Sequence, residues 1–548
     1  MDFSGKRKSR TSAGCSTYEI NVVAVGSTEN NPNTFDTYYI LSNKSSALII
    51  TLPASPVLQA KMTTNGVFSG KGYWAAIQNA DYYKVYVKYH DDALNNDQSK
   101  IQIFDATAIS SDMSHEGYKA FKTTNTYFNL VYAGAYDIIV VASQNKDGYQ
   151  SQDSNKLSNI EYALFDAAEN GKDIPYTIND MEHFNAIQYN PGANYVLGVA
   201  SFDIESLEII CGEDNMFAGT FDGNNATINL SIPSTNNTFI GLFGYIANGA
   251  VVKDFTLNVD IHSVAQTDSA IYVGSVAGFN HGTIQNISVN GTVSSEYNDG
   301  TTYIYNGGVV AVNYGTISYV LSKVSVLPKN NSNTVYAGGI ATINNGGTIE
   351  KSGFRGIASA QIVGGIVSQN LGGQIEQCYY ETDGSIQTSI TSSNDGSSYN
   401  AAGGIAGYMN GGLITYCYAN GRITANSISS EYVYAGGLVG YVDRNSSIGA
   451  SFVVGYDSSN AAQISATGLY AYTGVFVGDS DVDCSVNWLT CVKTNAQKFI
   501  GNSKKTLSFA ESTTDLKAAL SIKMNVSNYF ILDDAQSAYP YLKNAKYN

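Results

Sequence analysis

The chain has 548 residues, with 46 Asp and Glu against 30 Lys and Arg, so its formal net charge is −16. Because nucleic-acid binding depends on Lys and Arg neutralising phosphates, this acidic balance argues against DNA and RNA as partners. The chain is rich in Gly (53) and Tyr (41) and poor in Pro (8), and 43% of it is hydrophobic. This composition favours strands and tight turns around a core and argues against a disordered chain.

Three further classes receive no support from the sequence. The longest apolar runs, such as residues 47–52, are far shorter than the roughly 20 residues that span a membrane. Residues 1–12 start with basic residues, but no apolar segment follows, so we expect no standard secretory signal in this sequence. The six cysteines are sparse and form no CxxC pair, which argues against a disulfide framework and a structural zinc site.

The first third of the chain contains two kinds of β segment. Residues 1–54 form an N-terminal tail with strand-like runs at 18–25, 38–41 and 47–52, which could pair with a neighbouring domain or with another chain. Residues 55–160 have strand-like runs at 56–58, 73–74, 82–87, 136–142 and 148–154, spaced as in a small sandwich. This pattern resembles a fibronectin type III domain, which implies packing roles for Trp74 and Tyr136.

Two caps are expected beside the region that follows. Residues 161–235 are predicted to form a linker and an N-terminal cap, with a short helix that starts near Asn179 and aligns Met181, Phe184 and Ile187 on one face. Residues 501–548 are predicted to form a C-terminal cap with a helix at 514–520. Such caps would cover strand edges that otherwise invite aggregation.

Residues 236–500 repeat. A Gly-hydrophobic phrase recurs with its second position at residues 241, 275, 308, 339, 365, 404, 437 and 474, so the steps are 34, 33, 31, 26, 39, 33 and 37 residues. A second phrase begins at Asn280, Asn313, Asn345, Asn370 and Asn410, and a third resembles residues 287–293. A period near 33 predicts three short strands per coil, with Gly and Asn at corners of positive φ and Val, Ile, Leu and Ala in a shared core.

These phrases carry a resemblance. The sequence Gly-Gly-hydrophobic, Asn-x-Gly-x-Ile and Cys-Tyr-Ala-x-Gly is similar to the GLUG repeat of bacterial surface proteins, best at residues 435–441, and the similarity extends over residues 172–548. The lead-in at residues 217–228 and the ending at 530–542 also resemble those proteins. We therefore expect an all-β fold: a fibronectin type III-like sandwich followed by a parallel β-solenoid of about eight GLUG-like coils.

Candidate metal and catalytic residues are few. Asp479, Asp481 and Asp483 alternate and could share a calcium ion, although Cys484 and Thr490 stand where an EF-hand needs Gly and Glu, so a solvated loop is the alternative and no other cofactor is expected. Glu350 and Glu376 occupy equivalent points of neighbouring repeats, where stacking could bring a glycosidase-like pair together. No repeated Arg or Lys accompanies them, so no catalytic residue is assigned.

The histidines, the cysteines and most of the tyrosines are interpreted as structural residues. The five histidines sit apart without a metal or triad spacing, and Cys378 and Cys417 occupy matching places in consecutive repeats, which predicts inward stacking. A disulfide between Cys378 and Cys417, or between Cys484 and Cys491, is the alternative. Most tyrosines are expected to fill corners and faces, while inserted loops, notably residues 381–400, are better placed to bind a partner.

These observations predict a non-enzymatic structural or adhesion protein that is exposed outside a bacterial cell and presents a rigid repeat surface. Its expected partners are surface glycans or proteins, or other subunits of its own assembly, with a homo-oligomer among the arrangements considered. The alternatives are a phage virion structural or receptor-binding protein and a polysaccharide-active β-helix enzyme, which would need converging carboxylates and basic residues in one groove.

Overall fold

The computed structural model describes the chain in segments that belong to two compact units, Met1–Asn170 and Gly171–Asn548. The described residues are 2–10, 16–23, 48–62, 68–90, 101, 103–104, 106–110, 112, 114–130, 134–145, 150–162, 165, 169, 171–205, 210–233, 237–264, 270–297, 303–330, 335–388, 399–427, 432–443, 445–454, 464–480, 485–487, 489–492, 498, 500–501, 510–512, 530–531 and 541–542. The predicted helix at 514–520 lies outside them.

The N-terminal strands pair with one another. Strand β2 (Ser16–Val23) pairs antiparallel with β1 (Asp2–Arg10) and with β3 (Leu48–Leu52), which gives a separate three-stranded sheet. Two of the predicted strand-like runs therefore form strands here, and the run at 38–41 lies outside the described residues.

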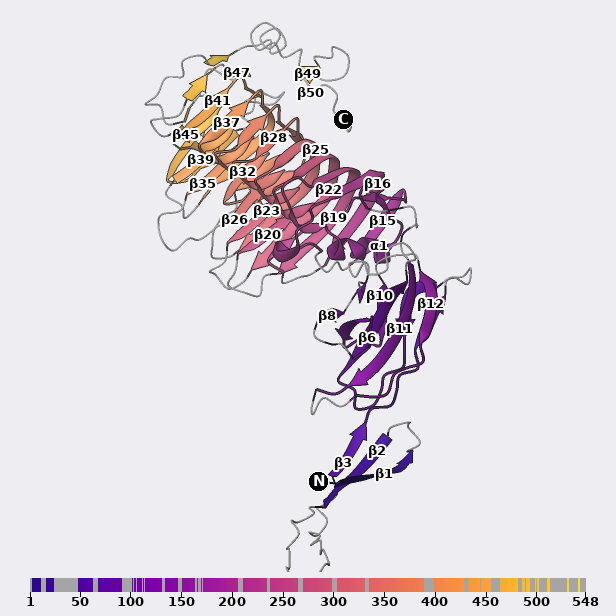
Figure 1. Ribbon diagram of the computed structural model, residues 1–548. Coiled ribbons are helices and arrows are strands. Elements are labelled where there is room, and N and C mark those ends of the chain that lie inside the picture. Colours follow the sequence, from indigo (N-terminus) through magenta and orange to yellow (C-terminus); the bar gives the residue numbers. More distant parts are fainter. Residues whose placement is uncertain are drawn as a thin grey trace, which may run out of the picture. The chain divides into compact units, whose positions relative to one another are not determined.

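The rest of the first unit is a nine-stranded, mainly antiparallel sheet (Figure 1). Its strands are β4 (Gln59–Met62), β5 (Phe68–Tyr73), β6 (Tyr82–His90), β7 (Ile103–Phe104), β8 (Thr107–Ile109), β9 (Lys119–Thr123), β10 (Tyr127–Leu130), β11 (Gly134–Ser143) and β12 (Leu157–Tyr162). The order is β7, β10, β5, β12, β11, β6, β9, β8, and β4 pairs with β5. Trp74 and Tyr136 are both buried in its core, in the packing roles expected of them. Assignment to the fibronectin type III class stays a prediction.

Two predicted strands of this unit are displaced. Residues 56–58 are not a strand, because Pro56 has no amide hydrogen to pair; instead the Asn155 side chain accepts from the Leu58 amide (2.7 Å) and donates to its carbonyl (2.8 Å). Described residues 151–154 are also not a regular strand: the amides of Ser151 and Ser154 donate to the Ala142 and Val140 carbonyls of β11, but their hydroxyls accept from the amides of the same two residues. The pairing continues instead at β12.

The second unit is a β-solenoid with three parallel sheets. The first sheet has one strand per coil: β17 (Phe239–Ile240), β20 (Ile271–Gly274), β23 (Ile304–Gly307), β26 (Val335–Gly338), β31 (Ile362–Gly364), β35 (Asn400–Gly403), β39 (Tyr432–Gly436) and β44 (Tyr470–Gly474). The second sheet follows it in each coil: β18 (Phe243–Ile246), β21 (Ala277–Asn280), β24 (Val310–Asn313), β27 (Ala341–Asn345), β32 (Val367–Leu371), β36 (Ala406–Asn410), β40 (Val439–Val442) and β45 (Val477–Ser480). Eight strands in each sheet confirm the predicted count of coils.

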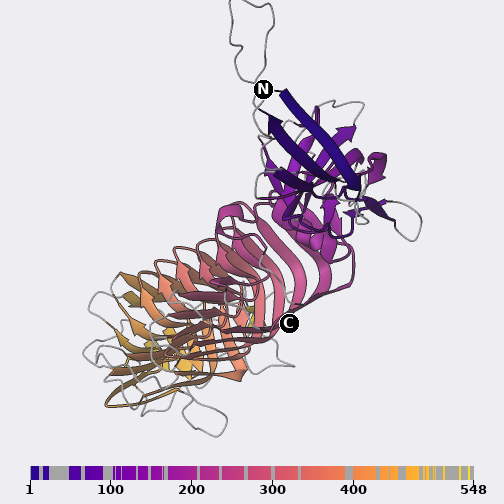
Figure 2. The same cartoon turned by 90° about the horizontal axis from the view of Figure 1, so that it is seen from below.

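The third sheet is longer and includes the strands that precede the first coil. It contains β13 (Tyr176–Ile178), β14 (Tyr195–Leu197), β15 (Ser201–Glu205), β16 (Thr220–Ile232), β19 (Val251–Val264), β22 (Thr283–Tyr297), β25 (Thr316–Asn330), β28 (Thr348–Glu350), β29 (Gly353–Phe354), β30 (Ile357–Ala360), β33 (Gln374–Glu376), β34 (Tyr379–Thr388), β37 (Gly412–Thr415), β38 (Tyr418–Asn426), β41 (Ser446–Gly449), β42 (Phe452–Val454), β43 (Ile464–Thr467), β46 (Ser485–Asn487), β47 (Leu489–Val492) and β48 (Ala510–Ser512). Figure 2 shows strands of successive coils lying side by side along the solenoid. A separate pair, β49 (Phe530–Ile531) and β50 (Tyr541–Leu542), is antiparallel.

A short helix covers the N-terminal end of the solenoid core. Helix α1 (Met181–Asn185) continues into a 3-10 turn, η2 (Ala186–Tyr189). Phe184 and Ile187 are fully buried, and the Phe184 ring contacts Phe202 and Phe221 at centroid distances of 5.6 and 6.3 Å. Two of the three residues predicted on one helical face are therefore buried, whereas Met181 is only partly buried, and the segment closes the core as a cap does.

The register corrects one step of the repeat and gives two values for another. In the first sheet Ile240 pairs with Val273, a step of 33 residues (273 − 240), whereas in the second sheet Phe243 pairs with Ala277, which is the predicted step of 34 (277 − 243). Gly474 pairs with Gly436, so the last step is 38 residues (474 − 436) and not 37. The other pairings keep equivalent glycines in register, from Gly274 to Gly307 and onward. Insertions therefore alter the length of a coil without shifting its strands.

The glycines and asparagines act differently from the prediction at most corners. Gly307 and Gly338 do not have positive φ; a Cβ on either would overlap a backbone carbonyl oxygen, so crowding and not backbone freedom requires glycine there. Gly346 and Gly372 do have positive φ, as predicted. At a bend within the third sheet the positive φ values of +46° to +61° belong mainly to other residues: Asp254, Asn286, Tyr319, Lys351, Gln377, Tyr416 and Ala450.

The repeated asparagines form a buried ladder inside the coils. Asn280 donates to Asn313 (2.8 Å), Asn313 to Asn344 (2.9 Å) and Asn344 to Asn370 (2.9 Å), and all four are fully buried. The third member is thus Asn344 and not Asn345, which pairs with Leu371. Each buried amide is satisfied by its neighbours, which makes its burial tolerable. In the next coil Met409 takes this position and the ladder ends.

Cys378 and Cys417 stack inside the coils as predicted. Both are fully buried free thiols, and the Cys417 sulfur accepts a hydrogen bond from the Cys378 amide at 3.4 Å. The alternative of a disulfide between them is therefore wrong. Cys484 and the side chain of Cys491 lie outside the described residues, so their pairing stays a prediction.

Candidate functional site

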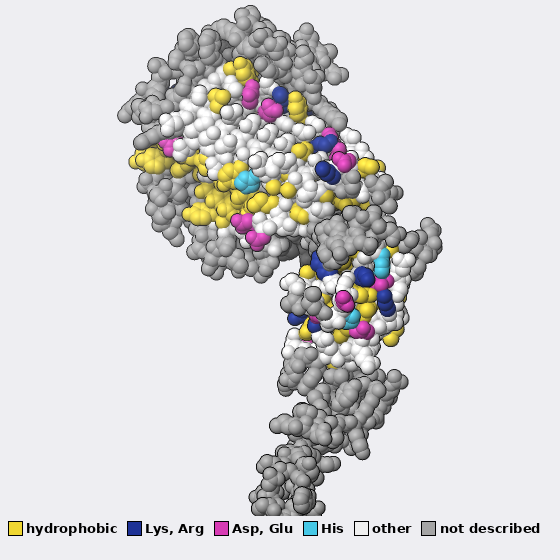
Figure 3. Space-filling view, in the orientation of Figure 1, with side chains coloured by type: hydrophobic (Ala, Val, Ile, Leu, Met, Phe, Trp, Pro, Cys, Tyr) yellow, Lys and Arg dark blue, Asp and Glu magenta, His cyan; other side chains and the backbone are white. Residues whose placement is uncertain are grey.

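A band of aromatic side chains lies on the outer faces of the first and second sheets. Figure 3 shows hydrophobic side chains gathered over β20, β23 and β26. We call the following residues the aromatic band: Phe239, Tyr245, Tyr272, Phe279, Tyr305, Tyr336, Tyr399, Tyr408, Tyr434, Tyr441 and Tyr472. Tyr272, Tyr305 and Tyr336 are outward-facing because they alternate with the buried residues of strands only a few residues long. Tyr245 and Tyr434 are buried among the other rings.

The rings of the aromatic band stack along the solenoid. Tyr272, Tyr305 and Tyr336 follow one another at centroid distances of 5.0 and 4.9 Å with interplanar angles of 5° and 6°. The column on the second sheet touches this column, since Phe279 lies edge-on to Tyr272 at 5.0 Å. Ring faces within a column are therefore covered by neighbouring rings, and the Tyr408 hydroxyl donates to Asp443 at 3.0 Å.

The aromatic band is uncharged at neutral pH. Burial raises the pKa of Tyr245 to about 12, and burial also raises the pKa values of Tyr272 and Tyr305 above the ordinary value for tyrosine. Four more accessible tyrosines lie near the band or at the starts of the strands that carry it, with exposed fractions of 42 to 49%: Tyr303, Tyr314, Tyr432 and Tyr470. These exposed side chains offer amphipathic contacts with little loss of conformational entropy.

A pocket of about 440 Å³ lies on the third sheet, over β15, β16, β19 and β22, with both polar and apolar residues in its lining. Its lining includes outward-facing side chains of Asp203, Asn229, Asn258 and Asn290, which occupy one register position on four consecutive strands. Asn290 donates to Asn258 (3.2 Å), Asn258 to Asn229 (2.8 Å) and Asn229 to the Asp203 carboxylate (2.6 Å). We call these four residues the outer amide ladder.

The outer amide ladder was not predicted from the sequence. Its three asparagines are separated by 29 (258 − 229) and 32 (290 − 258) residues, and each precedes a hydrophobic residue or glycine in the third phrase of its repeat. That recurrence was the available signal. The recurrence was easy to miss, because the segments before the first full coil belong to the cap and lack the Gly-hydrophobic motif that marks the repeats.

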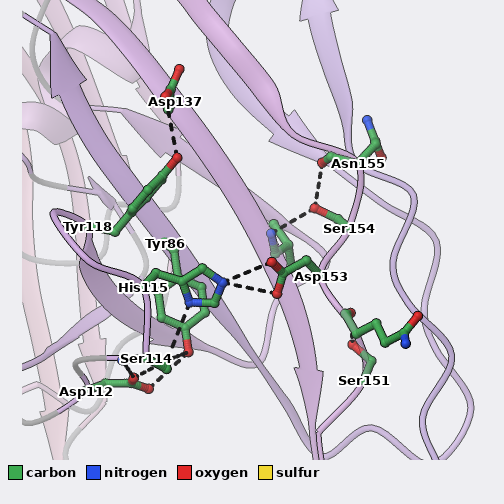
Figure 4. Close-up of polar contacts among 12 residues, drawn as sticks. Tyr86, Asp112, Ser114, His115, Tyr118, Asp137, Ser151, Asp153, Ser154 and Asn155 are labelled. Atoms are coloured by element: carbon green, nitrogen blue, oxygen red, sulfur yellow. Dashed lines mark hydrogen bonds and ion pairs between the residues drawn. The ribbon is translucent and has the colours of Figure 1, made fainter.

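Polar residues of the first unit form the second cluster that the sequence did not predict (Figure 4). The Asp112 carboxylate accepts hydrogen bonds from Lys84 (2.6 Å), Ser114 Oγ (2.5 Å) and Tyr86 (3.1 Å). His115 lies beside them, with Nε2 3.0 Å from Asp153 and Nδ1 3.4 Å from Ser114 Oγ. Ser114, His115 and Asp153 are therefore within reach of one another, although the sequence showed no triad spacing.

This cluster fits a structural network better than a nucleophilic triad. A triad requires the histidine to take the serine proton, whereas Ser114 Oγ has its short hydrogen bond with Asp112. Burial raises the pKa of Asp112, but the hydrogen bonds from Lys84, Ser114 and Tyr86 outweigh it and hold that pKa well below its usual range. Burial raises the pKa of Tyr86 to about 12. The side chains of Lys84, Ser114 and Tyr86 are thus all engaged with Asp112.

The predicted calcium residues are only partly described. Asp479 ends the second-sheet column of the aromatic band, next to Tyr441, and its Oδ1 accepts a hydrogen bond from the Ser480 amide at 2.8 Å. Asp481 and Asp483 lie outside the described residues. Among the residues that the structure does describe, no group of three or more His, Cys, Asp or Glu side chains is placed to hold a metal ion. The calcium site stays a prediction.

Glu350 and Glu376 do stack, as predicted. They pair directly in adjacent strands, β28 and β33. Lys351 Nζ lies 3.5 Å from Glu350 Oε2 and 5.1 Å from the centroid of the Tyr319 ring, so a fixed cation accompanies the carboxylates. This arrangement is typical of a solvated, ion-paired face.

Comparisons with known proteins give short, weak similarities. No protein-family model matches the chain. The chain is 27% identical over 213 residues to halomucin of Haloquadratum walsbyi, a match that covers 35% of this chain and 2% of that protein. It is 29% identical over 145 residues to a protein of Evansella cellulosilytica named as a Gly-rich membrane protein, covering 25% of this chain and 17% of that protein. The chain thus corresponds to a small part of each relative. In the described part of this chain, no helix is long and apolar enough to cross a membrane.

Proposed function

We propose that the chain is a non-enzymatic structural and adhesion protein of a cell surface, whose solenoid presents a rigid face to surface glycans or proteins. The observation that carries this proposal is the aromatic band with its exposed neighbours Tyr303, Tyr314, Tyr432 and Tyr470. An uncharged face with apolar edges and hydroxyls, repeated along stacked strands, suits many weak contacts that act together. The proposal includes the assignment of the repeats as GLUG-like, since repeats of that kind occur in bacterial surface proteins.

The similar proteins support the location. One relative is named halomucin and the other is named as a membrane protein, which fits a protein exposed at a cell surface. The absence of an enzymatic role is supported by the engaged carboxylates, since Glu350 is paired with Lys351 and Asp112 is occupied by three donors.

A binding experiment with matched variants tests the proposal. The full chain would be screened on a glycan array and on a panel of bacterial and host cells, beside the double variant Tyr303→Ser, Tyr314→Ser and the control Tyr73→Ser. Tyr73 is similarly exposed (41%) but belongs to the first unit. We expect the double variant to lose at least about tenfold in apparent affinity and the control to keep it.

Two results would contradict the proposal. Equal binding by the wild type and the double variant would remove the exposed neighbours of the aromatic band from recognition and with them the observation that carries the proposal. Release of sugar from a polysaccharide panel that is abolished by Glu350→Gln and Glu376→Gln would make the protein an enzyme.

A further inference from the structure

The third sheet carries a binding site of its own, on different strands from the aromatic band. We propose that the pocket over β15, β16, β19 and β22 binds an uncharged oligosaccharide through its hydroxyl groups. The polar side chains that line it and carry the argument are Asp203, Asn229, Ser231, Asn258, Asp260 and Asn290. Its volume of about 440 Å³ falls within the range of small-molecule sites.

The outer amide ladder leaves hydrogen-bonding groups for a ligand. Each asparagine amide has two N–H donors and an oxygen that accepts twice. The ladder bonds use one donor each from Asn229, Asn258 and Asn290. One N–H per residue and further acceptor positions remain, repeated at the roughly 4.8 Å spacing of paired strands. Sugar hydroxyls, which both donate and accept, match such a row of mixed donors and acceptors.

The ladder is also organised before a ligand arrives. Each side chain is held by its neighbour on the adjacent strand, so binding freezes few additional rotamers. The row ends on the Asp203 carboxylate at 2.6 Å, which makes that bond charge-assisted and polarises the amides behind it. The amide N–H groups that remain for a ligand are therefore held in fixed rotamers and are polarised toward stronger hydrogen bonds.

The charge of the pocket selects against anionic ligands. Its described lining contains the carboxylates of Asp203 and Asp260 and includes no Lys, Arg or His. Sulfated or uronic-acid sugars and phosphates would face repulsion there without a compensating cation. The lining also has no aromatic ring, so a single sugar would bind with a dissociation constant in about the millimolar range, and useful avidity requires several units.

The test uses the full chain with defined probes. Saturation-transfer NMR and isothermal titration would compare neutral hexasaccharides (maltohexaose, cellohexaose and mannohexaose) with anionic ones (oligogalacturonate and a heparin hexasaccharide), each up to about 10 mM. The variants are Asn258→Leu, which removes the centre of the ladder, and Asn258→Asp, which keeps its shape. The control is Gln285→Leu, an amide on the same sheet, on β22, that does not line the pocket.

We expect a neutral hexasaccharide to bind, both Asn258 variants to weaken it by at least about tenfold, and Gln285→Leu to leave it unchanged. Circular dichroism confirms that each variant is folded. No binding of any neutral probe, binding that survives Asn258→Leu, or a preference for the anionic probes at this pocket would each overturn the inference. The proposed function is judged separately, because cell binding lost in the Tyr303, Tyr314 variant but kept in Asn258→Leu would support the aromatic face as the cell-binding surface, whatever the oligosaccharide titrations show for the pocket.

Discussion

The buried asparagine ladder gives a prediction whose size can be worked out bond by bond. Asn344→Leu, a change of similar volume, removes three hydrogen bonds of ordinary length: from Asn313 (2.9 Å), to Asn370 (2.9 Å) and to the Gly347 carbonyl (3.1 Å). A fourth contact, with the Gln374 carbonyl at 3.5 Å, is too long to add appreciably. At about 1 kcal/mol per bond we expect the free energy of unfolding to fall by about 3 kcal/mol. Asn370→Leu removes two bonds, with Asn344 (2.9 Å) and the Gly373 carbonyl (3.0 Å), so we expect about 2 kcal/mol.

The double variant separates shared bonds from independent ones. Asn344→Leu combined with Asn370→Leu removes four distinct bonds, because one is common to both residues. We therefore expect a loss of about 4 kcal/mol in place of the additive 5, a coupling of about 1 kcal/mol. Met409→Leu is the control, since Met409 is fully buried at the same register position one coil further.

Guanidinium denaturation followed by circular dichroism would measure these losses. Hydrogen exchange of residues 341–376 would localise them, because stacked repeats need not unfold in one step. If Asn344→Leu is no less stable than Met409→Leu, or if the two single losses simply add, the hydrogen bonds of the ladder do not stabilise the coils as argued.

Three more predictions concern the backbone, pH and thiols. Ala450→Gly should raise the free energy of unfolding by about 1 kcal/mol, since Ala450 has φ of +46°, and an unchanged or lower guanidinium midpoint would contradict this. Burial raises the pKa of Asp137, but hydrogen bonds from Lys156, the Asn159 amide and His90 lower it to about 2. This carboxylate should therefore contribute about 2 kcal/mol above roughly pH 4, lost as the pH falls through about 2, and thermal melts of Asp137→Asn should lack that loss. Burial raises the pKa of the Cys378 thiol, so Cys378 and Cys417 should be alkylated by iodoacetamide only after unfolding, and rapid labelling of the folded protein, read by mass spectrometry, would refute their burial.

The sequence predicts those features that repeat with the coil. The Gly-hydrophobic phrase locates all eight coils, and the matching places of Cys378 and Cys417 predict their stacking, because parallel pairing keeps equivalent residues in register. Phe184 of α1 and Ile187 of η2 are predicted to share a buried face from helical spacing alone. These predictions depend on the regular recurrence of residue types along the chain, which remains recognisable when a coil contains an insertion.

Other features depend on contacts in three dimensions, which the repeated sequence motifs do not show. Asn344 and Asn345 are adjacent and chemically identical, so only strand pairing shows which of them enters the ladder. Tyr319 and Lys351 adopt positive φ although their residue types disfavour it, because the coil geometry imposes the bend. Ser114 and Asp153 meet at His115 only because separate segments of the first unit fold together.

The unequal steps of the repeat have a consequence for how such a protein can change. Between equivalent glycines one coil uses 26 residues (364 − 338) and the next uses 39 (403 − 364), yet both add one strand to each of the first two sheets. The rise from coil to coil is set by the backbone hydrogen bonds, at roughly 4.8 Å, and not by chain length. Much of the surplus chain lies between a third-sheet strand and the next first-sheet strand, as between β34 and β35. Foreign sequence inserted between these two strands should therefore leave the spacing of the coils unchanged. Segments inserted in several coils would then be separated by whole multiples of that spacing, whatever their own length.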